Sequence, residues 1–454
     1  MKKEVNFTEG PIFGPLIKFS IPVLLALFLQ AMYGAVDLLV VGQFGGVNSE
    51  MYVSAVATGS MIMQTITIVI MGLSMGLTVF IASKIGAGAK EEAGRIIGAG
   101  IWLFGIISVL ITIVMVVAAP AVARLMQAPE EAFDATVTYM IICSAGMFFI
   151  VAYNLLGSIF RGIGDSKMPL IAVAIACVLN VIGDMLFVAV FSMGAAGAAL
   201  ATVLAQAISV VLSVLIIRRK ELPFRFSIKY IRPVGAFVKQ ILKLGVPIAL
   251  QDLLVSISFL AIMAIVNDLG LTMSAGVGVA EKVCAFLMLV PSAYMQSMSA
   301  FVAQNMGAGK YERARRALWC GVASSLAVGI FIGVFTFVRG DLLAAIFGKD
   351  APVILAGAEY LKSYAIDCML TAFLFCFIGY FNGCESTTFV MIQGIVGGIG
   401  VRLPMSWILS RIEPVSLFRI GLATPMSTVV QILLCLFWFL YLRSVQKKRN
   451  AEMK

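Results

Sequence analysis

Four polar residues stand inside otherwise apolar stretches of the sequence. Asn180 and Asp184 occur in VLNVIGDMLF, Asp37 occurs in YGAVDLLVVG, and Thr202 occurs in GAALATVLAQ. A carboxylate in hydrocarbon costs about 2.5–3.5 kcal/mol even on a lenient insertion scale, so such residues are expected to serve a function. Carboxylate, amide and hydroxyl oxygens are ligands of small hard cations, and carboxylates also bind protons. The four residues therefore predict a site for a sodium ion or a proton.

Spacing and depth predict that these four side chains lie together. Asn180 and Asp184 are four residues apart and share one face of a helix. Counting along the spans puts Asp37, Asp184 and Thr202 in the outer halves of three different helices. Two carboxylates close together in a low-dielectric site cannot both stay ionised without a partner, so they titrate as a coupled pair around a proton or a cation. The alternative is that backbone groups or distant basic residues neutralise both acids.

The elements that carry these residues are predicted to be membrane-spanning helices. The 454 residues are 61% hydrophobic and only 12% charged, about half the charge content of a soluble domain. Runs of about 20 apolar residues cross a bilayer as helices, whereas barrel strands are shorter and alternate. We expect an all-α membrane protein with twelve spans, at about 15–41, 52–80, 95–119, 135–159, 168–190, 195–217, 240–267, 273–303, 316–338, 356–382, 387–410 and 416–442.

The distribution of basic residues predicts the orientation. The polar N-terminus leads into a full-length span with no small-residue cleavage site, so we expect no cleaved signal peptide. Lys and Arg gather in alternate loops, and this pattern predicts that both termini are cytoplasmic in a plasma membrane. The net charge of +10 is thereby explained by topology, and no nucleic-acid partner is expected. The basic segments are 84–95, 161–167, 218–243, 310–316 and the tail after 442.

The sequence repeats itself at a nearly constant offset. LIKFSIPVLL matches ILKLGVPIAL, ASKIGAGAKEEAGR matches AQNMGAGKYERARR, and SIFRGIGDS matches GYFNGCEST. An even number of helices per repeat gives both halves the same orientation, as in one class of transporters, and such lobes enclose a central cavity. The predicted domains are an N-terminal lobe at 1–217, a basic linker at 218–239, a C-terminal lobe at 240–442 and a cytoplasmic tail at 443–454.

Other chemistry is poorly supported. The chain has no histidine, which excludes histidine bases, serine-type triads and histidine-ligated metals, so neither an enzyme nor a resident cofactor is expected. The repeated GAG turns lack the preceding strand and the full spacing of a phosphate-binding loop, and a tight cytoplasmic turn is the better interpretation. The cysteines form no C-x-x-C pair and are interpreted as small apolar side chains in the spans. They are Cys143, Cys177, Cys284, Cys320, Cys368, Cys376, Cys384 and Cys435.

The C-terminal half carries further intramembrane charges. Tyr33, Asp252 and Asp367 are candidates for lining the cavity, and an ion pair between Glu281 and Arg402 is a structural alternative to function there. Two prolines, Pro22 and Pro247, occupy equivalent positions inside the first and seventh spans, where each removes a hydrogen bond and allows a bend.

Together these features resemble the multidrug and toxic compound extrusion (MATE) family along essentially the whole chain. The resemblance rests on the six-plus-six spans, Pro22 and Asp37 in the first helix, the repeated GAG turn, FRG at 160–162 and NVIGD in the fifth helix. It implies two lobes that alternate between inward-open and outward-open states and export cationic or amphipathic compounds against sodium or proton influx. It also implies a cation site at Asp37, Asn180, Asp184 and Thr202.

One departure from the family pattern bears on the coupling site. Members with C-lobe acids carry them at the positions of Val255 and Thr371 here, so the chain looks similar to the branch that uses N-lobe acids only. We expect a monomer that contacts membrane lipid and small amphipathic substrates. A flippase for a lipid-linked precursor is the nearest alternative, although it needs a strongly cationic cavity. A scaffold or receptor would not need converging carboxylates, and an embedded enzyme would need a nucleophile motif.

Overall fold

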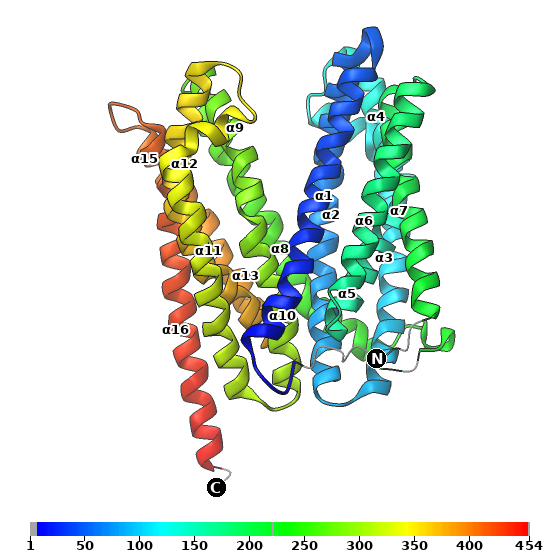
Figure 1. Cartoon of the computed structure of the whole chain (residues 1–454), viewed down its shortest axis with the longest axis vertical. Coiled ribbons are helices and arrows are strands. Elements are labelled where there is room, and N and C mark those ends of the chain that lie inside the picture. The colour runs from blue at the N-terminus through cyan, green and yellow to red at the C-terminus, as the bar shows by residue number, and fades with distance from the viewer. Residues whose placement is uncertain (1–6, 220–221, 223, 225, 453–454) are drawn as a thin grey trace. The chain divides into compact units, whose positions relative to one another are not determined.

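The structure, a computed structural model, describes residues 7–219, 222, 224 and 226–452, and within these it is helical with no strand. The helices before residue 220 are α1 (Phe13–Phe44), α2 (Ser49–Gly86), α3 (Lys90–Leu125), α4 (Glu130–Ala145), α5 (Met147–Ile163), α6 (Lys167–Asp184) and α7 (Gly194–Arg218) (Figure 1). The later helices are α8 (Gly235–Asn267), α9 (Leu271–Leu287), α10 (Leu289–Gly307), α11 (Tyr311–Ala345), α12 (Ala351–Gly383), α13 (Thr387–Ile395), α14 (Leu403–Ser410), α15 (Leu417–Gly421) and α16 (Ala423–Glu452).

The membrane spans confirm the predicted fold class. Among the described residues, 11 helical segments are long and apolar enough to cross a membrane, and the count rises to 12 when the bent pair α4 and α5 is taken as one span. Each of the twelve predicted segments has a counterpart in this set. Continuous apolar runs produce these helices because a backbone in hydrocarbon must satisfy its own hydrogen bonds.

The fourth predicted span, at about 135–159, contains a break. It is broken at Gly146 into α4 and α5, which meet at an angle of 53°. A Cβ atom at residue 146 would collide with the side chain of Val203 on α7, so glycine is needed for this close approach. The break thus follows from packing between helices, which a hydropathy profile does not contain.

The chain divides into two compact units. The first contains 1–249 together with 303–310, and the second contains 250–302 together with 311–454. The division therefore falls inside α8 and α10, whereas the predicted lobes are separated by a linker at 218–239. The domain limits predicted from the sequence repeats remain predictions. Parts of the predicted linker and tail, Lys220, Glu221, Pro223, Arg225, Met453 and Lys454, lie outside the described residues.

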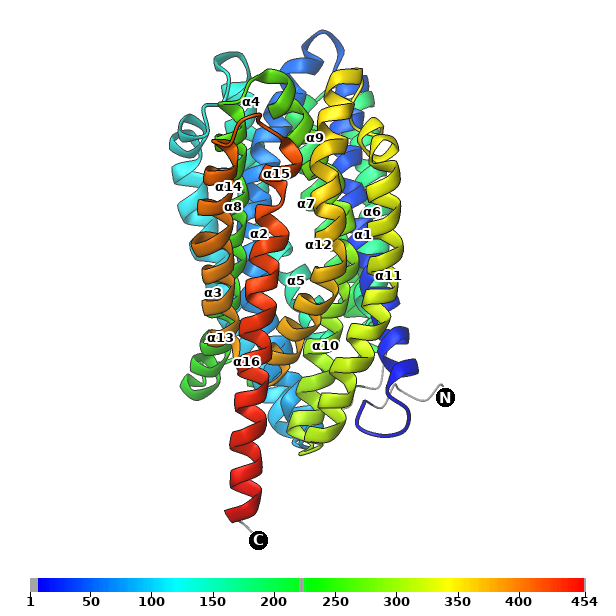
Figure 2. The same ribbon diagram turned by 90° about the vertical axis from the view of Figure 1, so that its left-hand side faces the viewer.

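Each unit has its own apolar core. In the first, α2 packs against α4 and α5, with Ile70, Leu77 and Phe104 fully buried. In the second, α12 lies between α11 and α16, as Figure 2 shows, and also packs against α9. Gly329 of α11 faces the carbonyl oxygen of Cys368 on α12, only 2.7 Å from where a Cβ atom would stand. Small residues of this kind let membrane helices pack closely.

Candidate cation-binding site

The four residues predicted to form a cation site are brought together by three helices of the first unit. Asp37 lies on α1, Asn180 and Asp184 lie one turn apart on α6, and Thr202 lies on α7. These helices pack against one another. The hydroxyl of Thr202 donates a hydrogen bond of 3.2 Å to Oδ2 of Asp37 and accepts one of 3.3 Å from Nδ2 of Asn180. Thr202 thus connects a carboxylate of α1 with an amide of α6.

The site presents buried oxygen atoms that lack donors. Asp37 is 4% exposed, Asn180 is 2% exposed and Asp184 is fully buried. Four of their oxygens have no hydrogen-bond partner among the described residues: Oδ1 of Asp37, Oδ1 of Asn180 and both carboxylate oxygens of Asp184. Unsatisfied buried oxygens are costly inside a membrane, and a bound cation or proton would satisfy them. The donor set therefore fits a small hard cation.

In the described part of the chain, the two carboxylates have no basic partner. Within the described residues neither Asp37 nor Asp184 takes part in a salt bridge, and the two carboxylates interact with each other. Two buried carboxylates that interact without a basic partner avoid repulsion if they share a proton or a cation. Helix α6 is followed directly after Asp184 by a π-helical segment, Met185–Val190. Such π segments are frequent at functional sites.

Two further polar residues extend this site. Tyr33, a predicted cavity-lining residue, lies one turn before Asp37 on α1, and it interacts with Asp37 and with the side chain of Gln206. Gln206 is 7% exposed, and sequence analysis did not single it out. Its spacing could have revealed it, because Gln206 follows Thr202 by four residues and therefore shares its helix face.

Asp252 and Asp367, the other candidate cavity residues, lie in the second unit. Asp252 is half-buried on α8, and Asp367 is 2% exposed on α12 beside Thr428. Asp367 interacts electrostatically with Arg402, a basic residue, whereas burial is the main influence on Asp252. These two acids therefore do not form a pair comparable to Asp37 and Asp184.

The expected ion pair between Glu281 and Arg402 is wrong as a direct contact. The guanidinium of Arg402 donates a hydrogen bond of 3.1 Å to Ser258 and lies 4.4 Å from the ring centre of Phe259. Glu281 accepts a hydrogen bond of 3.2 Å from Tyr360. Among the described residues no salt bridge joins Glu281 to Arg402, although the two still interact electrostatically. Each charge therefore contacts neutral groups directly: Tyr360 contacts Glu281, and Ser258 and Phe259 contact Arg402.

The remaining predicted features are placed as follows. Pro22 lies inside α1 and Pro247 inside α8, and neither helix ends at its proline. All eight cysteines are free, five of them buried, as expected of apolar packing residues. No cluster of three or more His, Cys, Asp or Glu side chains occurs in the described part of the chain, so a transition-metal site has no ligand set there.

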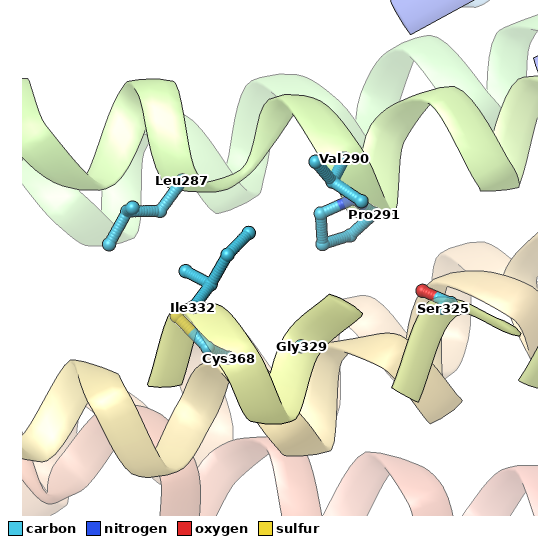
Figure 3. A pocket seen from close by; sticks show the side chains of 7 residues that line it. All are labelled: Leu287, Val290, Pro291, Ser325, Gly329, Ile332 and Cys368. Atoms are coloured by element: carbon cyan, nitrogen blue, oxygen red, sulfur yellow. The ribbon is translucent and has the colours of Figure 1, made fainter. Parts of the chain in front are cut away.

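A small cavity occurs in the second unit at the break between α9 and α10. It encloses at most about 230 Å³. Figure 3 shows its lining side chains on facing helices, and apart from Ser325 and Cys368 they are apolar or glycine. Typical ligand pockets measure about 300–1,000 Å³, so we assign no substrate site to this cavity.

Taken together, the apolar helical spans of the described residues define a multi-pass membrane protein, and its first unit contains a buried acidic pair. The MatE family model matches residues 22–186 and 247–408, which is more than half of the sequence, so the chain belongs to the MatE family. The first matched segment contains three of the four predicted cation ligands, Asp37, Asn180 and Asp184, whereas Thr202 lies between the two segments.

The chain is also similar in sequence to bacterial proteins that are named for multidrug resistance or export. "Probable multidrug resistance protein YpnP" of Bacillus subtilis is 29% identical over 411 residues, covering 90% of this chain and 88% of its own. "Multidrug export protein MepA" of Staphylococcus saprophyticus is 23% identical over 406 residues, covering 86% of each chain. A solved structure described as an outward-facing conformation of a multidrug resistance MATE family transporter has a TM-score of 0.91 at 22% identity, covering 99% of each chain. This structural likeness shows the fold.

Proposed function

We propose that the protein is a cation-coupled antiporter that exports cationic or amphipathic compounds by alternating access, with sodium or protons as the coupling ion. The observation that carries this proposal is the pair Asp37 and Asp184, buried in the first unit without a basic partner among the described residues. A buried acidic pair of this kind needs a mobile positive charge.

The geometry of the site supports a simple coupling mechanism. A proton would be shared between the carboxylates of Asp37 and Asp184, whereas a sodium ion would use the oxygens of Asp37, Asn180 and Asp184. Thr202 holds Asp37 and Asn180 in position through its two hydrogen bonds. Either ion reduces the negative charge of the site and so lowers its attraction for a cationic compound. Ion and compound then compete, and each shifts the transporter only by its differential affinity for the two states.

The class of exported compound is proposed from the relatives named for multidrug resistance or export. A flippase for a lipid-linked precursor would need a cluster of unopposed positive charges to hold a pyrophosphate. Arg402, a buried cation of the second unit, instead interacts electrostatically with Glu281 and Asp367. This arrangement favours the antiporter.

The distribution of basic residues also indicates how the chain is oriented in the membrane. We propose that both termini and the two GAG turns lie on the cytoplasmic side of the plasma membrane, because the loops on that side are rich in Lys and Arg. We further propose that coupling uses the acids of the first unit only, since Val255 and Thr371 replace the acids of the alternative site.

Transport in liposomes tests the proposal. The purified protein is reconstituted, and uptake of a fluorescent cationic dye is followed under a sodium gradient alone and then under a pH gradient alone. We expect one gradient to drive dye movement in the wild type. If neither gradient moves dye while the protein is folded and oriented in the membrane, the antiporter assignment is wrong, and lipid-linked substrates become the next test.

A further inference from the structure

The repeated GAG turns lie outside the cation site. Each turn contains a glycine whose backbone adopts a positive φ angle. Gly88 has φ +75° and Gly309 has φ +71°, a region that residues with a Cβ atom seldom adopt. These second glycines of each motif make the tight turns between α2 and α3 and between α10 and α11. A tight turn alone does not explain the first glycine of each motif.

The first glycines pack two helices backbone against backbone. A Cβ atom at Gly86, the last residue of α2, would collide with the carbonyl oxygen of Gln304 on α10. Reciprocally, a Cβ atom at Gly307, the last residue of α10, would collide with the carbonyl oxygen of Ser83 on α2. The two copies of the motif therefore contact each other, and both contact residues of α10 belong to the first unit.

A segment before α1 fastens the same end of α10. The ring of Phe7 is 1% exposed and packs edge to face on Phe19 of α1, with ring centres 5.1 Å apart. The backbone carbonyl of Phe7 accepts a hydrogen bond of 3.1 Å from Nδ2 of Asn305, and that of Thr8 accepts one of 2.9 Å from Nζ of Lys310. The ring thus holds this segment against α1, and the two hydrogen bonds connect it to Asn305 at the end of α10 and to Lys310 just after it.

The turn between α5 and α6 completes this cluster. Gln304 donates a hydrogen bond of 3.1 Å to the backbone carbonyl of Gly162, in the FRG segment. Gly164, with φ +89°, leaves room for its neighbours, because a Cβ atom there would stand 3.2 Å from Nε2 of Gln304 and 3.4 Å from the ring of Phe7. Segments from four parts of the sequence therefore meet around Phe7 and Gln304.

We propose that Phe7, Thr8 and the paired GAG turns form a latch that holds the end of α10 against the first unit, and that this latch opens during each transport cycle. Residues 289–302 of α10 belong to the second unit, whereas 303–307 belong to the first, so any movement between the units acts on this helix. The inference rests on the proposed alternating access, in which the end bearing the GAG turns must open to load substrate.

Accessibility of a buried thiol tests the latch without requiring transport. Ala303 is fully buried near the end of α10, so Ala303→Cys places a small reporter there. Inside-out vesicles are treated with a membrane-impermeant maleimide, and peptide mass spectrometry follows labelling at that position only. We expect Phe7→Ala and Gly307→Ala each to accelerate labelling about tenfold, the effect of losing a ring contact or a close backbone fit.

Two matched controls separate the latch from general loosening. Gly14→Ala is a control for the glycine change, because a Cβ atom there meets nothing within 4 Å. Lys310→Ala removes only the exposed lysine that bonds to Thr8, and Lys90→Ala makes the same change at the corresponding lysine of the first GAG turn. We expect the Lys310 change to accelerate labelling about threefold, and the Gly14 and Lys90 changes to leave it at the wild-type rate.

The labelling rates test the latch separately from the proposed transport function. The latch is overturned if folded Phe7→Ala and Gly307→Ala are labelled at the wild-type rate. If those two variants aggregate, a wild-type labelling rate in Lys310→Ala overturns it instead. Equal acceleration by the control substitutions also overturns it. Failure of dye transport with the expected labelling pattern would instead reject the proposed function and leave the latch in place.

Discussion

Replacement of Asp184 by asparagine is the sharpest test of the cation site. Asp184 is fully buried, and neither of its carboxylate oxygens has a hydrogen-bond partner among the described residues. Asparagine has nearly the same shape, so the substitution removes a negative charge while the packing of α6 against α1 and α7 is retained. The effect on cation binding should therefore be mainly electrostatic.

The expected magnitude follows from Coulomb's law. A carboxylate about 4 Å from a monovalent cation contributes about 4 kcal/mol of attraction at an effective dielectric constant of about 20. Since about 1.4 kcal/mol corresponds to a tenfold change in affinity, loss of this attraction weakens cation binding roughly a thousandfold. The new amide can also donate a hydrogen bond to Asp37, which further reduces the need for a cation.

Dye transport in liposomes and cation titration measure this change. In Asp184→Asn the gradient that drives the wild type should move no dye, and half-saturation by the coupling ion should shift by roughly three orders of magnitude. Asp134→Asn is the control, because Asp134 is an exposed aspartate of α4 in the same unit. Retained coupling in Asp184→Asn, or equal loss in the control, would refute the assignment of the site.

Three further predictions test the surroundings of the site. Thr202→Val removes both hydrogen bonds of the hydroxyl with little change in volume. We expect cation affinity to fall about 10–100-fold in the same titration. An unchanged affinity would contradict the positioning role of Thr202. Gly146→Ala should force α4 away from Val203, at a cost of about 1–3 kcal/mol, and so lower the midpoint of thermal unfolding in detergent. Adding Val203→Ala should restore much of the lost stability. No rescue would show that the strain lies elsewhere. Glu281→Gln and Asp252→Asn should leave the ratio of coupling ion to dye within about twofold of the wild-type value, whereas abolished coupling in either would place a coupling ion in the second unit.

Much of the fold and of the candidate site could be predicted from the sequence. The membrane spans follow from local composition, because each helix in a bilayer must consist of a long apolar run. The grouping of Asp37, Asn180, Asp184 and Thr202 could be inferred from helix periodicity and from depth in the membrane. Both rules apply along a single chain segment and need no knowledge of its neighbours.

Other features depended on contacts between distant segments. Arg402 lies against Ser258 and Phe259 although its charge suggested pairing with Glu281. Phe7 gave no sign of being buried, since it stands in a polar segment before the first span. Its environment is created by α1, the turn after α5 and the end of α10.

By itself the sequence determined the class of protein, the number of spans and which polar residues must have a purpose in the membrane. Only the tertiary structure decided which oxygens of Asp37, Asn180 and Asp184 lack donors, and why Gly86 and Gly307 occur at matching places in the two repeats. The physical reason is that composition and periodicity act within one helix. Hydrogen-bond satisfaction and close backbone approach depend on atoms that other helices supply.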